Sequence, residues 1–173
     1  IVDVAPAVAQ RVRGWDTATT KGGGDWTVGV KLSRADGLFY VEHVEREQMS
    51  AGEVERRMLA MARFDGAGCA QREEMEKGSS GEIAAAAHTR YLAGFDHAGT
   101  RITGDKVTRA RPFMAQCEAG NVRLVRGSWN ADYLAELCSF PTGQHDDQVD
   151  ATSCAFNSLT LNVRAPGDYG LTI

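Results

Sequence analysis

Alternation of apolar and polar residues near the N-terminus predicts three strands. The segments 11–17, 26–32 and 38–44 all alternate in this way. A Gly-rich turn at 19–25 separates the first two segments, and a short turn at 35–37 separates the second and third. Strands joined by such short connections pair antiparallel. The first quarter of the chain therefore predicts an antiparallel meander.

From residue 50 onward the apolar spacing becomes mostly that of helices. Ser50 followed by Glu53 indicates a capping box at the start of a helix that reaches about residue 64. The segments after it are predicted as a strand at 68–74, a flexible turn at 78–81, a helix at 82–92, a short strand around Ile102, a helix at 108–119, a fifth strand at 122–125, and helices at 131–140 and from 147 to about 162.

This order of elements predicts an α/β fold in one domain. Three antiparallel strands followed by alternating helices and strands should form a mixed five-stranded sheet, with parallel strands added to the meander and helices on both faces. The domain is expected to span residues 1–162, with residues 163–173 as a C-terminal tail. The chain begins at Ile1 rather than Met, which we interpret as a domain taken from a longer protein.

Composition narrows the class of protein. The chain has 173 residues, of which 43% are hydrophobic and 24% charged, as in a globular domain. No apolar run is long enough to span a membrane, and the first residues do not form a signal peptide. Four cysteines without Cys-x-x-Cys spacing are expected to be buried free thiols.

The charge balance argues against a purely electrostatic nucleic-acid binder, because the net charge is −4. It does not exclude a nuclease, since a metal site itself needs acidic residues. Between residues 101 and 126 basic residues outnumber acids, which would suit either a phosphate-facing strip or a solvated helix face.

The most acidic stretch, 145–150, lies at the start of the last predicted helix. Asp147 and Asp150 are three residues apart and share a helix face, so they could hold one cation; the same residues would also suit an ordinary helix start. Asp16 ends the first predicted strand, and Glu73 or Glu74 ends the fourth. Ligand sites tend to form where strand ends meet, and clustered carboxylates with oxygen ligands favour Mg²⁺ or Mn²⁺.

Five sequence blocks in order resemble the nuclease domain of tailed-bacteriophage terminase large subunits. They are Arg13-Gly14-Trp15-Asp16-Thr17-Ala18 with the Gly-rich 21–27, the acid-then-Gly-Ser block 73–81, the basic block 104–110, the turn 118–122, and the closing block 140–151. One block would be weak evidence, but five in order cover nearly the whole chain.

The resemblance implies an RNase H-like fold and a metal-dependent endonuclease that cuts concatemeric double-stranded viral DNA during packaging, in the host cytoplasm. Carried over by position, its metal ligands are Asp16, Glu74 and Asp147, with Asp150 as a fourth. Glu74 is preferred to Glu73 because it has the family's spacing to Gly78. In the implied two-metal mechanism, Asp16 bridges two divalent cations, and Glu74 and Asp147 each complete one site.

The resemblance also implies DNA contacts and partners. Lys106, Arg109 and Arg111 are expected to contact phosphates without reading bases. Lys77 is assigned the same role, although it stands where the family more often has Pro or Gly, and Glu82 stands where Lys is frequent. The full-length protein would add an ATPase domain, a small terminase subunit and a portal as partners. This chain has no Gly-x-x-x-x-Gly-Lys-Ser/Thr motif, so it should not bind ATP in that way.

Three alternative functions remain open from the sequence. One is another RNase H-like nuclease, such as a junction resolvase or transposase core. A second is an HD-type metal phosphohydrolase, indicated by His145-Asp146 with His43, His88 and His97 upstream, which would need an all-helical scaffold. A third is a DNA- or portal-docking module that is inactive without its ATPase domain.

Simpler roles are favoured for a few residues in these motifs. His145 is expected to be a partly exposed helix-capping residue. Trp15 and Trp26 are expected to pack in the core rather than stack on bases.

Overall fold

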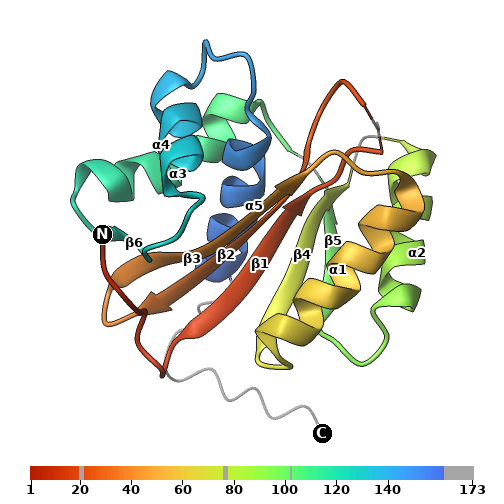
Figure 1. Cartoon of the computed structure of the whole chain (residues 1–173), viewed down its shortest axis with the longest axis horizontal. Helices are drawn as coiled ribbons and strands as arrows, with labels where there is room; N and C mark the ends of the chain where they lie inside the picture. Colours follow the sequence, from red (N-terminus) through yellow and green to blue (C-terminus); the bar gives the residue numbers. More distant parts are fainter. Residues whose placement is uncertain (20–21, 76–77, 102, 162–173) are drawn as a thin grey trace, which may run out of the picture.

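The computed structural model describes residues 1–19, 22–75, 78–101 and 103–161, and these residues form one mixed sheet with helices on both faces (Figure 1). The strands of the described residues are β1 (Gln10–Asp16), β2 (Thr27–Ala35), β3 (Leu38–Glu47), β4 (Cys69–Met75), β5 (His97–Arg101) and β6 (Val122–Leu124). The helices are α1 (Ala51–Asp65), α2 (Ser79–Tyr91), α3 (Lys106–Glu118), α4 (Asn130–Ser139) and α5 (Asp147–Leu161).

The strands lie in the order β5-β4-β1-β2-β3-β6. β1, β2 and β3 pair antiparallel, as the alternating pattern predicts. β4 pairs parallel to β1, β5 parallel to β4, and β6 parallel to β3. The predicted mixed α/β sheet is therefore confirmed, and an all-helical HD-type scaffold is wrong.

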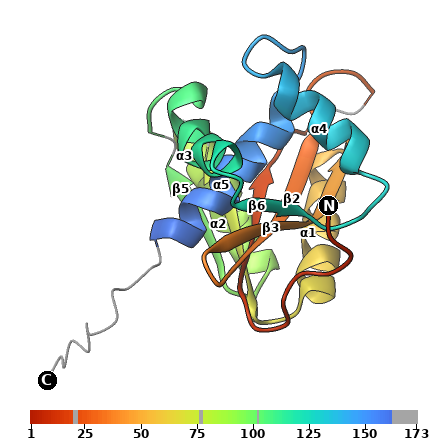
Figure 2. The same ribbon diagram turned by 90° about the vertical axis from the view of Figure 1, so that its left-hand side faces the viewer.

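The two faces of the sheet carry different helices. α3, α4 and α5 cover one face, with α5 directly against β1 and β2, and α1 and α2 cover the other (Figures 1 and 2). Residues along β1 alternate between these layers. Val12 belongs to the apolar core under α5, whereas Trp15 is fully buried in the core under α1, which confirms its predicted packing role.

The sheet has six strands in the described residues rather than the predicted five. The added strand, β5, has the sequence His-Ala-Gly-Thr-Arg, which is half exposed and lacks the β-branched alternation of the central strands. It forms at the edge because β4 offers a parallel partner from Gln71 to Met75. Its pairing is a tertiary effect and has no strong local signal.

Two other predictions need correction. The turn predicted at 78–81 is mostly the first turn of α2, because Gly78 adopts a φ of 106° and turns the chain directly into a helix that begins at Ser79. All four cysteines are free, but only Cys69 and Cys154 are buried, whereas Cys117 and Cys138 are exposed on α3 and α4.

Some predictions fall outside the described residues, namely those for Lys77, for a strand at Ile102 and for the tail 163–173. Within the described part of the chain, none of the helices combines the length and apolar character needed to cross a membrane.

Candidate metal centre

The site begins with the close packing of α5 on β1. A Cβ atom on Gly14 would clash with the carbonyl oxygen of Ala151 and lie 2.5 Å from the backbone nitrogen of Ala155. Glycine in the strand and alanines in the helix therefore let the two backbones approach. Asp16 follows Gly14 by two residues and lies on the same face of β1, so it points towards the start of α5.

Four carboxylates from three elements line one cleft of about 990 Å³. Asp16 ends β1, and Glu74 lies near the end of β4, which runs parallel to β1 and so ends at the same edge of the sheet. Asp147 and Asp150 lie in the first turn of α5. The structure thus brings together all four residues that the sequence nominates as metal ligands.

Glu73 and Glu74 point to opposite faces of β4. Glu74 Oε2 lies 3.2 Å from Arg109 Nη2 of α3, on the α5 side of the sheet. Glu73 is buried on the other side, where His88 Nδ1 donates to its Oε2 at 2.8 Å and His97 Nε2 lies 3.2 Å from its Oε1. Both residues border the cleft, but Glu73 is already bound by two imidazoles.

Burial and mutual repulsion disturb the cleft carboxylates. The pKa of Asp16 is raised well above its usual value, mainly by burial and then by the negative charges of Asp150 and Asp147. Burial also raises the pKa values of Asp147 and Glu74, although a backbone hydrogen bond from Trp26 and the charge of Arg109, respectively, oppose it. Without a cation, the folded chain therefore bears an electrostatic cost at this site.

Two basic residues of α3 partly neutralise the acids. Lys106 Nζ donates to Asp146 Oδ1 at 2.6 Å and lies 2.9 Å from Asp150 Oδ2. Arg109 Nη2 donates to Asp150 Oδ1 at 2.8 Å and also faces Glu74. Burial lowers the pKa of Lys106, but its bonds to these two aspartates outweigh burial and raise it. Lys106 and Arg109 thus lie at the cleft, as predicted, but their charged groups face carboxylates.

The donor set fits a hard divalent cation. It consists of carboxylate oxygens, and Asp147 Oδ2 is buried without a hydrogen-bond partner among the described residues. Within that same part of the chain, no three His, Cys, Asp or Glu side chains are already arranged as a complete ligand set. Asp150 and Glu74 are engaged by α3, so side chains would have to turn towards an ion for it to be bound.

The remaining nominated residues lie at different places. Arg111 is exposed on α3 and is not among the described residues that line the cleft. His145 is partly exposed, with Nδ1 3.8 Å from Asp147 Oδ2, consistent with a residue at the helix start. Trp26 is half-buried, with the Arg46 guanidinium 4.3 Å from its ring centroid.

Sequence reasoning overlooks two acids that line the cleft, Asp25 and Asp146. Asp146 reads as part of a helix start, and its neighbour Asp147 is the available signal. Asp25 ends the Gly-rich turn and has no periodic pattern around it. Both add negative charge to the same cleft.

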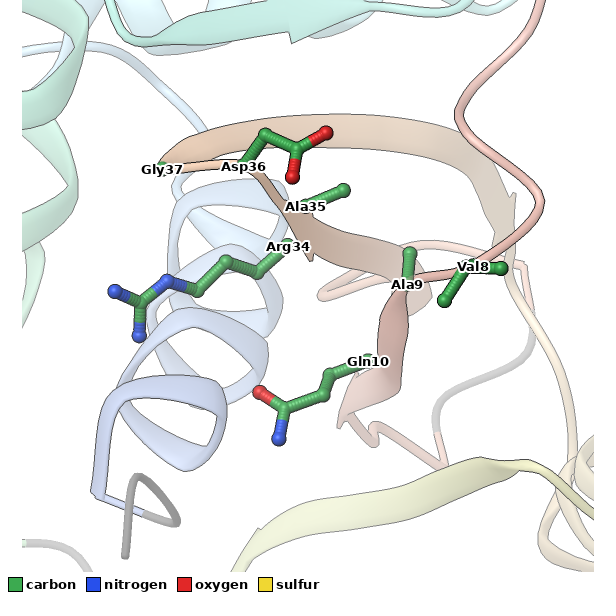
Figure 3. A pocket seen from close by; sticks show the side chains of 7 residues that line it. All are labelled: Val8, Ala9, Gln10, Arg34, Ala35, Asp36 and Gly37. Carbon is green, nitrogen blue, oxygen red and sulfur yellow. The ribbon is translucent and has the colours of Figure 1, made fainter. Parts of the chain in front are cut away.

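A second hollow, of about 520 Å³, lies at the opposite end of the sheet, beside the β2–β3 turn (Figure 3). Its charged side chains are Arg34 and Asp36, and the others that line it are Val8, Ala9, Gln10, Ala35 and Gly37. This set offers neither clustered carboxylates nor a basic cradle. The acidic cleft is therefore the better candidate for a catalytic site.

An acidic cleft where β1 and β4 end beside α5, on a mixed sheet that starts with an antiparallel meander, is typical of RNase H-like domains. The model of the terminase RNase H-like domain family matches residues 13–159, so the chain belongs to that family. This confirms the resemblance inferred from the five sequence blocks. No relative was found among curated protein sequences.

Solved structures share the fold at low sequence identity. The large terminase nuclease of thermophilic phage G20c with bound zinc is 18% identical, with a TM-score of 0.66 over 90% of this chain and 84% of that one. The large terminase of another thermophilic bacteriophage is 13% identical, with a TM-score of 0.69 over 92% of this chain but only 42% of that one. The manganese-soaked, inhibitor-bound terminase nuclease domain of human cytomegalovirus is 10% identical, with a TM-score of 0.65 over 88% and 85% of the two chains.

Proposed function

We propose that this chain is the nuclease domain of a phage DNA-packaging terminase and that it cuts concatemeric double-stranded viral DNA by metal-dependent hydrolysis of phosphodiester bonds. The observation that carries the proposal is the convergence of Asp16, Glu74, Asp147 and Asp150 in one cleft. Family membership supports it, as do similar nucleases solved with magnesium and zinc and one soaked with manganese.

Asp16, Glu74, Asp147 and Asp150 would hold two Mg²⁺ or Mn²⁺ ions. When bound, such a pair of ions activates water and stabilises the leaving oxygen of the phosphodiester. Asp16 lies between the strand acid Glu74 and the helix acids, which suits the bridging role. The raised pKa values of Asp16, Glu74 and Asp147 mean that cation binding would relieve repulsion already present in the folded chain.

Lys106 and Arg109 would have two successive roles. In the ion-free chain they neutralise Asp150, with Lys106 also bound to Asp146 and Arg109 to Glu74. Once cations take over these carboxylates, the two basic groups become free to contact DNA phosphates and set register without reading bases. Arg111 and Lys77 stay proposed as further phosphate contacts.

Larger partners follow from the same proposal. The chain matches less than half of the full large terminase from the second thermophilic phage, which is consistent with an ATPase domain elsewhere in the full-length protein. The small terminase subunit and the portal would be further partners, and the work would take place in the host cytoplasm.

Plasmid cleavage in Mn²⁺ tests the function. Asp16→Ala and Asp147→Ala should abolish cutting while circular dichroism shows a folded chain. Asp36→Asn, in the exposed β2–β3 turn at a φ of 50° that Asn tolerates, is the matched control and should cut normally. Unchanged cutting by both alanine variants would refute the site assignment. Preference for four-way junctions over linear duplex would favour a resolvase, and no cutting by the wild-type chain would favour a docking module.

A further inference from the structure

Glu136, on α4, is a buried carboxylate that binds the start of α5. Its Oε1 accepts a hydrogen bond from the backbone nitrogen of Gln148, and its Oε2 accepts one from Gln148 Nε2, both at 2.6 Å. Glu136 is 7% exposed and Gln148 is 1% exposed. Gln148 lies between Asp147 and Asp150, so this pair of bonds acts on the turn that carries both acids.

The start of α5 needs an acceptor from elsewhere. The first backbone N–H groups of a helix have no partner inside it, and a side chain just before the helix usually supplies one. Asp146 occupies that place, but its Oδ1 accepts a bond from Lys106 Nζ. Glu136 supplies the acceptor instead, and its negative charge lies at the helix N-terminus, where the helix dipole favours an anion.

A second contact path links Glu136 to Asp147. Arg46 Nη2 lies 3.6 Å from Glu136 Oε2, and the Arg46 guanidinium stacks on the Trp26 ring. The backbone nitrogen of Trp26 donates to Asp147 Oδ1 at 3.3 Å. The first turn of α5 is thus fixed by α4 and by the chain just before β2, with the buried Asp147 Oδ2 left available in the described structure.

We propose that Glu136 is a positioning residue, which caps α5 from α4 and thereby sets the direction of Asp147 and Asp150 and the affinity of the cleft for divalent cations. This inference rests on the proposed function, since it assigns these aspartates to metal binding. Outer contacts of this kind typically account for about 10- to 100-fold in metal affinity.

Three variants separate positioning from general stability. Glu136→Leu removes both hydrogen bonds. Glu136→Gln keeps an oxygen for the Gln148 backbone, and the Gln148 amide can flip to accept from the new amide, so it serves as the conservative rescue. Gln148→Leu removes only the side-chain bond. Glu42→Gln is the matched control, because Glu42 is another largely buried acid, paired with Arg11 and Lys31 away from the cleft.

Two measurements on the 173-residue chain test the proposal. Hydrogen exchange in the absence of metal should show a protected Gln148 amide in the wild-type chain and in Glu136→Gln, and an unprotected one in Glu136→Leu. Calorimetric titration with Mn²⁺ should show a loss of affinity of about 10- to 100-fold in Glu136→Leu, with a smaller loss in Glu136→Gln. Glu42→Gln should lower the melting temperature and leave Mn²⁺ affinity unchanged.

Wild-type Mn²⁺ affinity in a folded Glu136→Leu chain would overturn the positioning role alone. If Glu136→Leu does not fold, wild-type affinity in both Glu136→Gln and Gln148→Leu would overturn it. Absence of Mn²⁺ binding by the wild-type chain would instead refute the proposed function together with the inference, while exchange at Gln148 would still report the cap.

Discussion

Gly14 of β1 lies directly beneath Ala151 of α5, with no space for a side chain between the strand and the helix carbonyl oxygen. This contact sets the distance between the strand that ends in Asp16 and the helix that begins with Asp147. Because the opposing atoms are backbone, they cannot rotate away from a new methyl group as a flexible side chain could.

Gly14→Ala is therefore expected to destabilise the chain by about 1–3 kcal/mol, the usual range for overpacking. Displacement of α5 should also weaken Mn²⁺ binding, measured by calorimetry beside a thermal melt. Gly68→Ala is the control, since a Cβ there meets nothing within 4 Å in the described structure. Equal effects of the two substitutions would contradict the close-packing argument.

Asp16→Asn should stabilise the metal-free chain at neutral pH. The pKa of Asp16 is raised in the fold, so its stabilising contribution is complete below the usual value of 3.8 and is lost as pH rises through the raised pKa. Asn keeps the neutral form at every pH. The melting temperature should rise by a few degrees, since about 1 kcal/mol corresponds to roughly 2–4 °C at this size.

The advantage of Asp16→Asn should disappear in acid, where Asp16 itself is protonated. It should reverse in saturating Mn²⁺, because the ion stabilises only a chain that binds it. Thermal melts at several pH values, with EDTA or Mn²⁺, measure both effects. A metal-free melting temperature below that of the wild-type chain at neutral pH would show that Asp16 carries no electrostatic cost.

Glu73→Gln and Glu74→Gln should have opposite effects on stability and metal affinity. Glu74→Gln should weaken Mn²⁺ binding with little loss of stability. Glu73→Gln should leave Mn²⁺ affinity near that of the wild-type chain but cost about 1–3 kcal/mol, because the buried His88 and His97 lose their carboxylate. The reverse result would make Glu73 the ligand.

The stability loss in Glu73→Gln should depend on pH in a defined direction. Burial raises the pKa of Glu73, but His88 and His97 outweigh burial and lower it, so its contribution is lost as pH falls. Burial lowers the pKa of His88, but Glu73 outweighs burial and raises it, so that contribution is lost as pH rises through the raised value. The loss should be greatest between the usual pKa values of 4.5 and 6.5, as urea unfolding at several pH values would show.

Lys106→Met should increase Mn²⁺ affinity and decrease DNA affinity. The substitution removes a cation that competes for Asp150, and it also removes one phosphate contact, which should reduce the salt slope of DNA binding by about one. Arg111→Gln is the comparison, because Arg111 is exposed and lies outside the cleft lining; it should leave Mn²⁺ affinity unchanged. Weaker Mn²⁺ binding in Lys106→Met would contradict competition between lysine and metal.

Local sequence patterns are enough to identify which acids could meet. The alternation that ends at Asp16 and the helix start at Asp147 place acids at the ends of elements. Parallel strands then bring their ends to a common edge, so the four nominated carboxylates are predictable before any contact is known. The edge strand β5 is not predictable in this way, because its own residues have no strong strand pattern and its form depends on β4.

The surroundings of these acids depend on how the helices pack against the sheet. A two-residue period says that Glu73 and Glu74 face opposite sides of β4, but it does not say which side holds α5. The pairing of Lys106 with Asp150 and the capping of Gln148 by Glu136 each join residues on separate helices. No local pattern encodes such contacts, because they form only when α3 and α4 are packed beside the start of α5.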